Sequence, residues 1–159
     1  MLQCWMSCII IRNVMDITLK PIGTAKNQEK KHFGGWKDVA TDLVIDEEYT
    51  DALMGLWEYS HVVVVYWMHN VHTCELRHVP QGKVGEVPEV GIFACRCAQR
   101  PNPIGVSTAE ILSIVNNVVS VKGLDVIDGT PILDVKPYTP QYDSVPDARV
   151  PGWVGKLEY

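Results

Sequence analysis

The sequence contains little of what marks a membrane span or a protein that coats nucleic acid. Its longest uninterrupted apolar run, residues 62–68, is far too short to cross a bilayer. Lys and Arg number 14 against 19 Asp and Glu, which gives a net charge of −5. Because nonspecific nucleic-acid binders are usually basic, this balance excludes a bulk electrostatic binder, but not a protein with a local basic patch.

The cysteines do not form the framework of a secreted, disulfide-stabilised domain. There are five, an odd number, and two of them lie within the first fourteen residues. No basic segment precedes the apolar start of the chain, and no small-residue cleavage site follows it, so we expect no signal peptide. We therefore expect reduced thiols and a cytoplasmic protein.

The first fourteen residues differ in character from the rest of the chain. They are apolar with one charge, Arg12, and a second methionine follows at Met15. We interpret residues 1–14 as an extension from an upstream start and residues 15–159 as one barrel domain. A genuine extra edge strand at residues 8–11 is the alternative.

Runs of alternating or continuous apolar residues predict a protein made mostly of strands. The predicted strands are residues 16–22, 41–47, 61–68, 91–94, 104–115, 118–125 and 132–135. Asn116 and Asn117 predict a tight hairpin turn, and Thr50 is predicted to cap a short helix over residues 51–56, with Leu53 and Leu56 toward the core. The clustered prolines predict an extended, irregular stretch over residues 136–155. The pattern favours an all-β, mainly antiparallel barrel or sandwich.

The segment from Cys95 to Ser107 is the most unusual in the chain. Pro101 and Pro103 stiffen the backbone, and two arginines, Arg96 and Arg100, precede them. A rigid loop with a fixed guanidinium suits a carboxylate or a phosphate. The alternative is a rigid connection that carries solvated arginines.

A second segment, residues 123–138, combines a turn with titratable side chains. Asp128 and Gly129 indicate a turn. Asp134, Lys136 and Tyr138 would share one face of a strand. Such a face could handle a proton or bind a ligand, or it could be a solvated surface with one ion pair.

Together these segments resemble the TsaA-like family of tRNA-methyltransferase O proteins. The run RPNPIGVS at residues 100–107 and the run DGTPILDVKPY at residues 128–138 closely resemble two long motifs of that family. GLWEYSH at residues 55–61 and PDAR at residues 146–149 are similar to two shorter ones. The resemblance covers roughly residues 19–149.

The resemblance implies a fold, a reaction and an assembly. Members form a single-sheet β-barrel, here with one or two short helices, bind S-adenosylmethionine and are usually homodimers. They methylate N6 of threonylcarbamoyl-adenosine beside the tRNA anticodon. By position, the implied cofactor-binding residues are Trp36, His69, Asn70, Arg96, Val106, Leu124, Asp125, Val126 and Ile127.

The remaining roles concern the substrate and the proton. We expect the anticodon stem-loop of tRNA to be the partner, and Arg100, Asn102, Lys136, Tyr138 and Arg149 to bind it. A urea-like acceptor nitrogen is a weak nucleophile, and either Asp134 or His69 could assist it. Four early lysines, Lys26, Lys30, Lys31 and Lys37, could extend the basic patch or form a solvated loop.

Departures from the family pattern keep other functions open. The segment before the main motif reads ACRCA at residues 94–98, where members have ATRSP, and the short lysine-rich early loop looks archaeal. The alternatives are a non-catalytic S-adenosylmethionine-binding sensor and a methyltransferase for another substrate. A zinc site is a weaker alternative, because the spacing of His69, His72, Cys74 and His78 matches no standard zinc motif.

Overall fold

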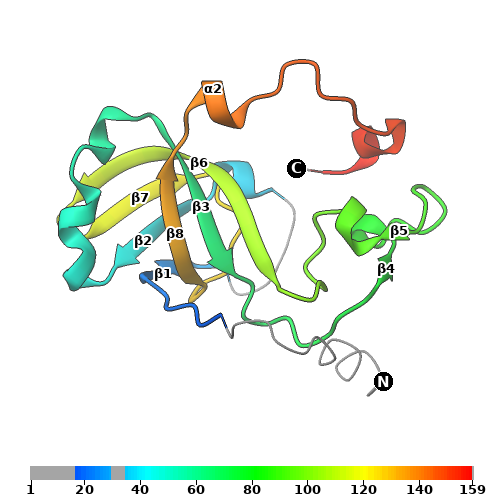
Figure 1. Ribbon diagram of the computed structural model, residues 1–159, viewed down its shortest axis with the longest axis horizontal. Helices are drawn as coiled ribbons and strands as arrows, with labels where there is room; N and C mark the ends of the chain where they lie inside the picture. Colours follow the sequence, from blue (N-terminus) through cyan, green and yellow to red (C-terminus); the bar gives the residue numbers. More distant parts are fainter. Residues whose placement is uncertain (1–16, 30–34, 159) are drawn as a thin grey trace. The chain divides into compact units, whose positions relative to one another are not determined.

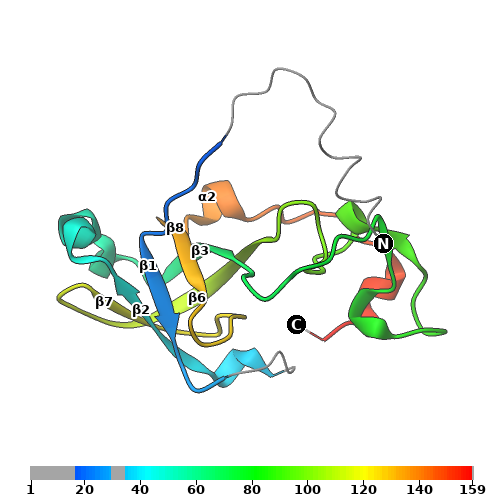
Figure 2. The ribbon, with the colours of Figure 1, turned by 90° about the horizontal axis from the view of Figure 1, so that it is seen from below.

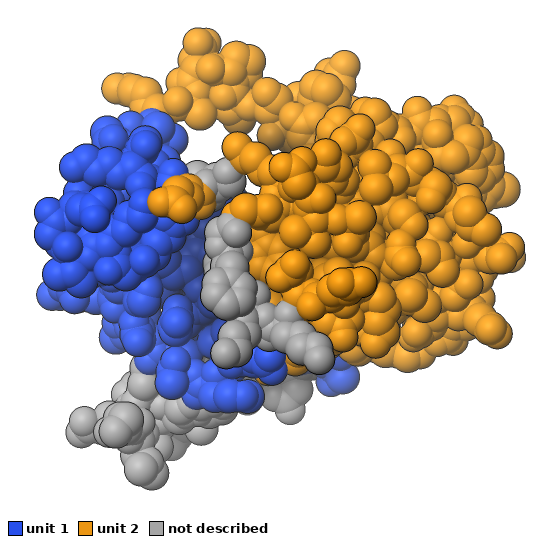
Figure 3. All heavy atoms as spheres, turned by 180° about the vertical axis from the view of Figure 1, so that it is seen from behind, with its two compact units in different colours: residues 1–19, 70–103, 150–157 blue, residues 20–69, 104–149, 158–159 orange. Residues whose placement is uncertain are grey.

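The computed structural model describes residues 17–29 and 35–158. The interpretation of residues 1–14 as an extension, and the alternative strand at residues 8–11, lie outside these residues. The chain forms two compact units, coloured separately in Figure 3. We call the larger one the barrel unit, mainly Lys20–His69 and Ile104–Arg149, and the smaller one the loop unit, mainly Asn70–Pro103 and Val150–Leu157.

Six antiparallel strands close into a barrel within the barrel unit (Figure 1). They are β1 (Gly23–Lys26), β2 (Ala40–Ile45), β3 (His61–Trp67), β6 (Ile104–Val115), β7 (Val118–Lys122) and β8 (Pro131–Pro137). Their order is β1-β2-β7-β6-β3-β8, and β8 pairs with β1 to complete the closure. The expected all-β, mainly antiparallel barrel is therefore confirmed.

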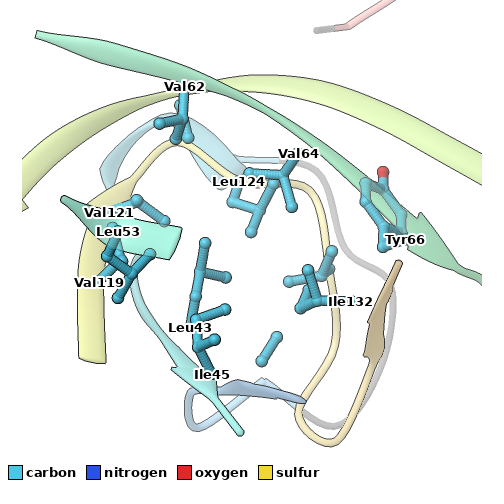
Figure 4. Packing of buried hydrophobic residues seen from close by; sticks show 13 residues of the cluster. Leu43, Ile45, Leu53, Val62, Val64, Tyr66, Val119, Val121, Leu124 and Ile132 are labelled. Carbon is cyan, nitrogen blue, oxygen red and sulfur yellow. The ribbon is translucent and has the colours of Figure 1, made fainter. Parts of the chain in front are cut away.

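Strict alternation of side chains builds the core of the barrel. In β3, Val62, Val64 and Tyr66 are buried, and the residues between them are partly exposed. Figure 4 shows these side chains meeting Leu43 and Ile132 from other strands in one apolar cluster. Burying each large aliphatic side chain contributes about 1.5–3 kcal/mol, so this interior holds the sheet that carries the outward-facing residues.

The predicted hairpin turn at Asn116 and Asn117 is confirmed. Val115 pairs with Val118, and Asn116 has a φ of 55°. Asparagine tolerates this left-handed conformation better than most residues, which suits a two-residue connection. Asn117 then donates from Nδ2 to the carbonyl oxygen of Ile45, tying the hairpin to the end of β2.

The predicted helix differs in type and in its start. A 3₁₀ helix, η2, spans Glu47–Leu53, and a second, η3, spans Leu56–Glu58. Thr50 lies inside η2, where its Oγ1 donates to the carbonyl oxygen of Glu47 at 2.8 Å, so it is not the cap. Gly55, at a φ of 83°, separates the two helices. Leu53 and Leu56 do pack against the core, as predicted.

Two predicted strands are wrong, and a third is too long. Residues 17–22 form no strand; β1 begins at Gly23, where a Cβ would lie 2.4 Å from the carbonyl oxygen of Val44. β1 thus begins where a glycine lets it approach β2 closely. The pattern of apolar residues does not predict this start, because glycine has no side chain. Most of residues 91–94 is a 3₁₀ helix, η5 (Ile92–Ala94). The strand predicted over residues 118–125 ends at Lys122, because Gly123 turns the chain with a φ of 84°.

The loop unit contains little regular structure. It comprises β4 (Arg77–His78), β5 (Val90–Gly91), η4 (Pro80–Gly82), η5 and η6 (Gly152–Lys156). Pro80, Val87, Ile92 and Pro103 are its buried residues. Lys156 Nζ donates to the carbonyl oxygen of Glu86 at 2.9 Å, which attaches η6 to the rest of the unit.

The proline-rich stretch over residues 136–155 is more ordered than predicted. It contains the end of β8, a short helix, α2 (Pro140–Asp143), and the start of η6. The Asp143 carboxylate accepts the backbone N–H of Thr139 at 2.7 Å and so supports the start of α2. Within the described ranges, no helix has the length and hydrophobicity that a membrane span requires.

Candidate functional site

The barrel parts of the two long motifs lie on either side of β3. Val65 of β3 pairs with Val106 of β6 on one side and with Asp134 of β8 on the other. Figures 1 and 2 both show β3 between these two strands. Side chains directly opposite on antiparallel strands share one face. Val106, Val65 and Asp134 therefore form a row on the outer face of the barrel.

The inward face of the first motif has a structural role that the sequence analysis missed. Gly105 pairs with Tyr66, and a Cβ on Gly105 would lie 2.1 Å from Cε2 of the Tyr66 ring. The ring thus occupies the space that the glycine leaves open. The Tyr66 hydroxyl lies 3.1 Å from the hydroxyl of Ser107. Two of the four residues in the run IGVS, Gly105 and Ser107, thus contact the buried side chain of Tyr66.

The predicted polar face on β8 is present. Lys136 Nζ lies 2.5 Å from Asp134 Oδ2, and both side chains are substantially exposed, at 64% and 44%. The hydrogen bond and the charge of Asp134 raise the pKa of Lys136. Tyr138 follows next to His61, with ring centroids 6.3 Å apart. The arrangement is a solvated ion pair that leaves a carboxylate accessible from outside the barrel.

The loop between β7 and β8 is fastened by Asn27, another residue that the sequence analysis missed. Asn27 Nδ2 donates to the carbonyl oxygen of Val126 at 3.0 Å and to Oγ1 of Thr41 at 3.1 Å. The backbone N–H of Asn27 donates to Oδ1 of Asp128 at 3.2 Å. One asparagine therefore links the loop to the end of β1 and to β2.

Residues 124–127, which the resemblance assigns to cofactor binding, form part of this loop and not a strand. Leu124 and Val126 are buried in the core. The N–H of Val126 donates to the carbonyl oxygen of Leu124, and its own carbonyl oxygen accepts from Asn27. The side chains of Asp125 and Ile127 are only half-buried. Contact between a cofactor and residues 124–127 thus remains a prediction. The backbone N–H and carbonyl oxygen of Val126 already have partners within the protein.

Trp36 and this loop lie close together. Trp36 begins a 3₁₀ helix, η1 (Trp36–Asp38), and the next residue, Val39, accepts the N–H of Gly123 at 3.1 Å. Lys122 Nζ also lies 3.0 Å from Oδ1 of Asp38. The start of the loop is thereby held beside η1, which brings two predicted cofactor-binding segments into one neighbourhood of the barrel unit.

His69 follows the end of β3 and has an unsatisfied polar atom. Its Nδ1 is buried and has no hydrogen-bond partner among the described residues. A buried polar nitrogen without a partner costs free energy, and such atoms are uncommon unless a ligand or water satisfies them. This atom fits the prediction that His69 contacts a bound molecule.

The predicted residues divide between the two units. Trp36, His69, Val106, Leu124, Asp125, Val126, Ile127, Asp134, Lys136, Tyr138 and Arg149 belong to the barrel unit, and Asn70, Arg96, Arg100 and Asn102 to the loop unit. Asn70, Arg96, Asn102 and Arg149 are exposed. The guanidinium of Arg100 instead donates to backbone carbonyl oxygens of its own loop.

The zinc alternative finds no support in the geometry. Over residues 17–29 and 35–158, no three side chains of His, Cys, Asp or Glu gather in an arrangement that could hold a metal ion. His78 Nδ1 lies 2.6 Å from Oε2 of Glu75, a pair rather than a cluster. Burial, and next the hydrogen bond and charge of Cys95, raise the pKa of the Cys97 thiol to about 12.

Comparison with known proteins supports the resemblance over most of the chain. Residues 25–144 match the family model described as the tRNA-methyltransferase O N-terminal domain. An S-adenosyl-L-methionine-binding protein of Archaeoglobus fulgidus is 39% identical over 132 residues, which are 80% of this chain and 93% of that protein. A tRNA (adenine(37)-N6)-methyltransferase of Escherichia coli is 35% identical over 67% of this chain and 47% of the enzyme.

Solved structures show the same fold. The crystal structure of TrmO from Pseudomonas aeruginosa aligns with a TM-score of 0.70 and 29% identity over 85% of this chain. The alignment covers 62% of that chain, so this protein spans less than two thirds of the solved structure and about half of the Escherichia coli enzyme. The protein belongs to the tRNA-methyltransferase O N-terminal domain family.

Proposed function

We propose that the protein is an S-adenosylmethionine-dependent tRNA methyltransferase that acts on N6 of the adenine beside the anticodon. The observation that carries the proposal is the family match over residues 25–144, together with relatives in Escherichia coli, mouse and human named tRNA (adenine(37)-N6)-methyltransferase. We further propose that the acceptor base is threonylcarbamoyl-adenosine, as the sequence motifs imply, and that the enzyme works in the cytoplasm as a homodimer.

Two groups of residues are proposed to hold the cofactor. In the barrel unit these are Trp36, His69, Val106, Leu124, Asp125, Val126 and Ile127; in the loop unit they are Asn70 and Arg96. The partnerless Nδ1 of His69 and the contacts of Lys122 with Asp38 and of Gly123 with Val39 support the first group. The guanidinium of Arg96 suits the carboxylate of the cofactor. When bound, S-adenosylmethionine supplies the methyl group on its sulfonium.

The protein's own residues orient the acceptor and accept its proton. Methyl transfer needs the acceptor nitrogen aligned with the methyl group, and positioning alone can supply several kcal/mol. Asp134 is the favoured proton acceptor, because its side chain is accessible on the outer face of the barrel beside Lys136. His69 is the second candidate. Lys136, Tyr138, Asn102 and Arg149 remain the proposed contacts to tRNA.

Analysis of tRNA nucleosides from cells that lack the protein tests substrate and reaction together. Mass spectrometry should show loss of the methylated threonylcarbamoyl-adenosine and accumulation of its unmethylated form. Restoring the wild-type gene should return the methylated nucleoside, and an Arg96→Ala gene should not. An unchanged nucleoside profile would contradict the proposed substrate.

A non-catalytic binding module is the second candidate. The archaeal relatives that this chain spans almost completely, at 93% and 96% of their length, carry names that state only S-adenosylmethionine binding. Calorimetry and a turnover assay on the same preparation separate the two functions. Binding without methylation of any tRNA would support the module, and turnover would support the enzyme.

A further inference from the structure

The guanidinium of Arg100 is surrounded by backbone carbonyl oxygens of the loop that precedes it. Its Nε donates to the carbonyl oxygen of Cys97 at 3.0 Å. Its Nη2 donates to the carbonyl oxygens of Ile92 at 3.1 Å and Cys95 at 2.7 Å. The backbone N–H of Arg100 also donates to the carbonyl oxygen of Ala98 at 2.7 Å. Arg100 is half-buried, so these contacts are partly shielded from water.

The acceptors lie on both sides of Arg96 in the sequence. Cys95 and Cys97 are its immediate neighbours, and Ile92, buried at 2% exposure, anchors the start of the loop in the loop unit. Arg100 thus fixes the peptide group before Arg96 and the peptide group after Cys97 relative to a buried residue. Only a planar guanidinium presents several donors in one rigid arrangement, so lysine cannot reproduce these bonds. Pro101 restrains the backbone of Arg100 from the other side.

We propose that Arg100 is a positioning residue, which acts through Arg96 to set the affinity for the cofactor, and that it does not contact tRNA. The inference rests on the proposed function, in which Arg96 binds the cofactor carboxylate. It revises the substrate-binding role suggested by the sequence, because three of the five guanidinium N–H donors, those on Nε and Nη2, already bind carbonyl oxygens of the loop. Hydrogen bonds from a charged donor are stronger than neutral ones, so their loss loosens the loop.

The test compares Arg100→Lys with Arg77→Lys, a matched change at an exposed arginine of the same unit whose guanidinium lies 3.9 Å from Glu89. We expect Arg100→Lys to weaken S-adenosylmethionine binding by about tenfold in calorimetry, the loss of one charged hydrogen bond. The KM for the cofactor should rise by a similar factor, with kcat at saturation and the KM for tRNA nearly unchanged. Arg77→Lys should match the wild type.

A second readout does not depend on the cofactor. We call the three hydrogen bonds of the Arg100 guanidinium to its loop the Arg100 clamp. Cys95 and Cys97 are free thiols on that loop. Their reaction with an aromatic disulfide reagent should accelerate in Arg100→Lys and remain unchanged in Arg77→Lys. The rate of this thiol reaction tests the clamp even if the wild type does not bind S-adenosylmethionine. Absence of cofactor binding would reject the proposed function and leave the clamp to be judged by the thiol reaction.

Two results would overturn the inference. One is a folded Arg100→Lys variant with wild-type cofactor affinity and thiol reactivity. The other is a raised KM for tRNA with unchanged cofactor affinity, which would return Arg100 to substrate binding. If Arg100→Lys does not fold, Arg100→Gln, whose amide can reach one or two of the carbonyl oxygens, should show the same pattern; wild-type affinity and reactivity in that variant would equally reject the clamp.

Discussion

Single residues of β3, β6 and β8 carry two kinds of constraint. Gly105 is constrained by the Tyr66 ring, which lies where a side chain would be. Asp134 instead points outward, and its contact with Lys136 is solvated. Substitution of Gly105 should therefore change the stability of the barrel, and substitution of Asp134 should change the rate of methylation.

Gly105→Ala should destabilise the barrel by about 1–3 kcal/mol, because its methyl group overlaps the buried ring. Urea denaturation measures the change. Gly91→Ala is the matched control: nothing lies within 4 Å of its added Cβ, so its stability should change by less than about 0.5 kcal/mol. Equal stability of the two variants would contradict the packing of Tyr66 against Gly105.

Asp134→Asn should lower kcat by about a hundredfold if Asp134 accepts the proton. Because its ion pair is solvated, the variant should lose less than about 1 kcal/mol of stability. Single-turnover methylation and thermal unfolding measure the two quantities, with Lys136→Gln as a control that breaks the same pair without removing the carboxylate. Full activity of Asp134→Asn would transfer the role to His69.

The Cys97 thiol should make stability depend on pH in the alkaline range. Its folded pKa of about 12 lies above the ordinary thiol value of 9.0, so the folded state keeps a proton that the unfolded chain releases. The stabilising contribution is complete below pH 9 and is lost as the pH rises toward 12. The difference in Tm between wild type and Cys97→Ser should therefore shrink between pH 8 and pH 10.5. A constant difference would show that burial does not suppress ionisation of Cys97.

At the scale of elements, the loop between β7 and β8 depends on contacts distant in sequence. Asn27 bonds to Asp128, 101 residues away, and to Val126, 99 residues away. Regular strand pairing ends at Lys122 on β7 and resumes at Pro131 on β8. The loop is therefore held by side-chain hydrogen bonds as well as by its own turn.

Asn27→Ala should cost about 1–3 kcal/mol, since the carbonyl oxygen of Val126 and the hydroxyl of Thr41 lose a donor in a partly buried site. Cofactor affinity should also fall, because residues 124–127 lose their fixed position. Urea denaturation and calorimetry measure the two effects. Gln28→Ala, an exposed neighbour, should leave both unchanged. A stable Asn27→Ala variant with normal affinity would show that the loop is held by other contacts.

The same elements show what sequence patterns can predict. β3 and β6 follow from apolar runs in which valine and isoleucine predominate, because β-branched side chains fit a pleated strand. The start of β1 and the 3₁₀ form of η5 were mispredicted, because strand approach at Gly23 and helix type at Ile92 depend on packing between segments. The motifs are visible in the sequence, but the hydrogen bonds of Arg100 and Asn27 are not. Their acceptors are backbone carbonyl oxygens, which come within reach only when the loops have folded.

At the scale of the whole molecule, charge and family membership have to be reconciled. The chain carries a net charge of −5, yet relatives are named as tRNA methyltransferases. Phosphate contacts depend on local cations rather than on net charge. Lys26, Lys37, Lys136 and Arg149 are exposed cations of the barrel unit, and they are the proposed source of that local charge.

The most direct measurement of the central claim is transfer of a labelled methyl group from S-adenosylmethionine to purified tRNA by the full chain. The account predicts label on the adenine beside the anticodon in tRNA that carries threonylcarbamoyl-adenosine, and none in the same tRNA transcribed without modification. Cofactor binding without transfer to either tRNA would contradict it.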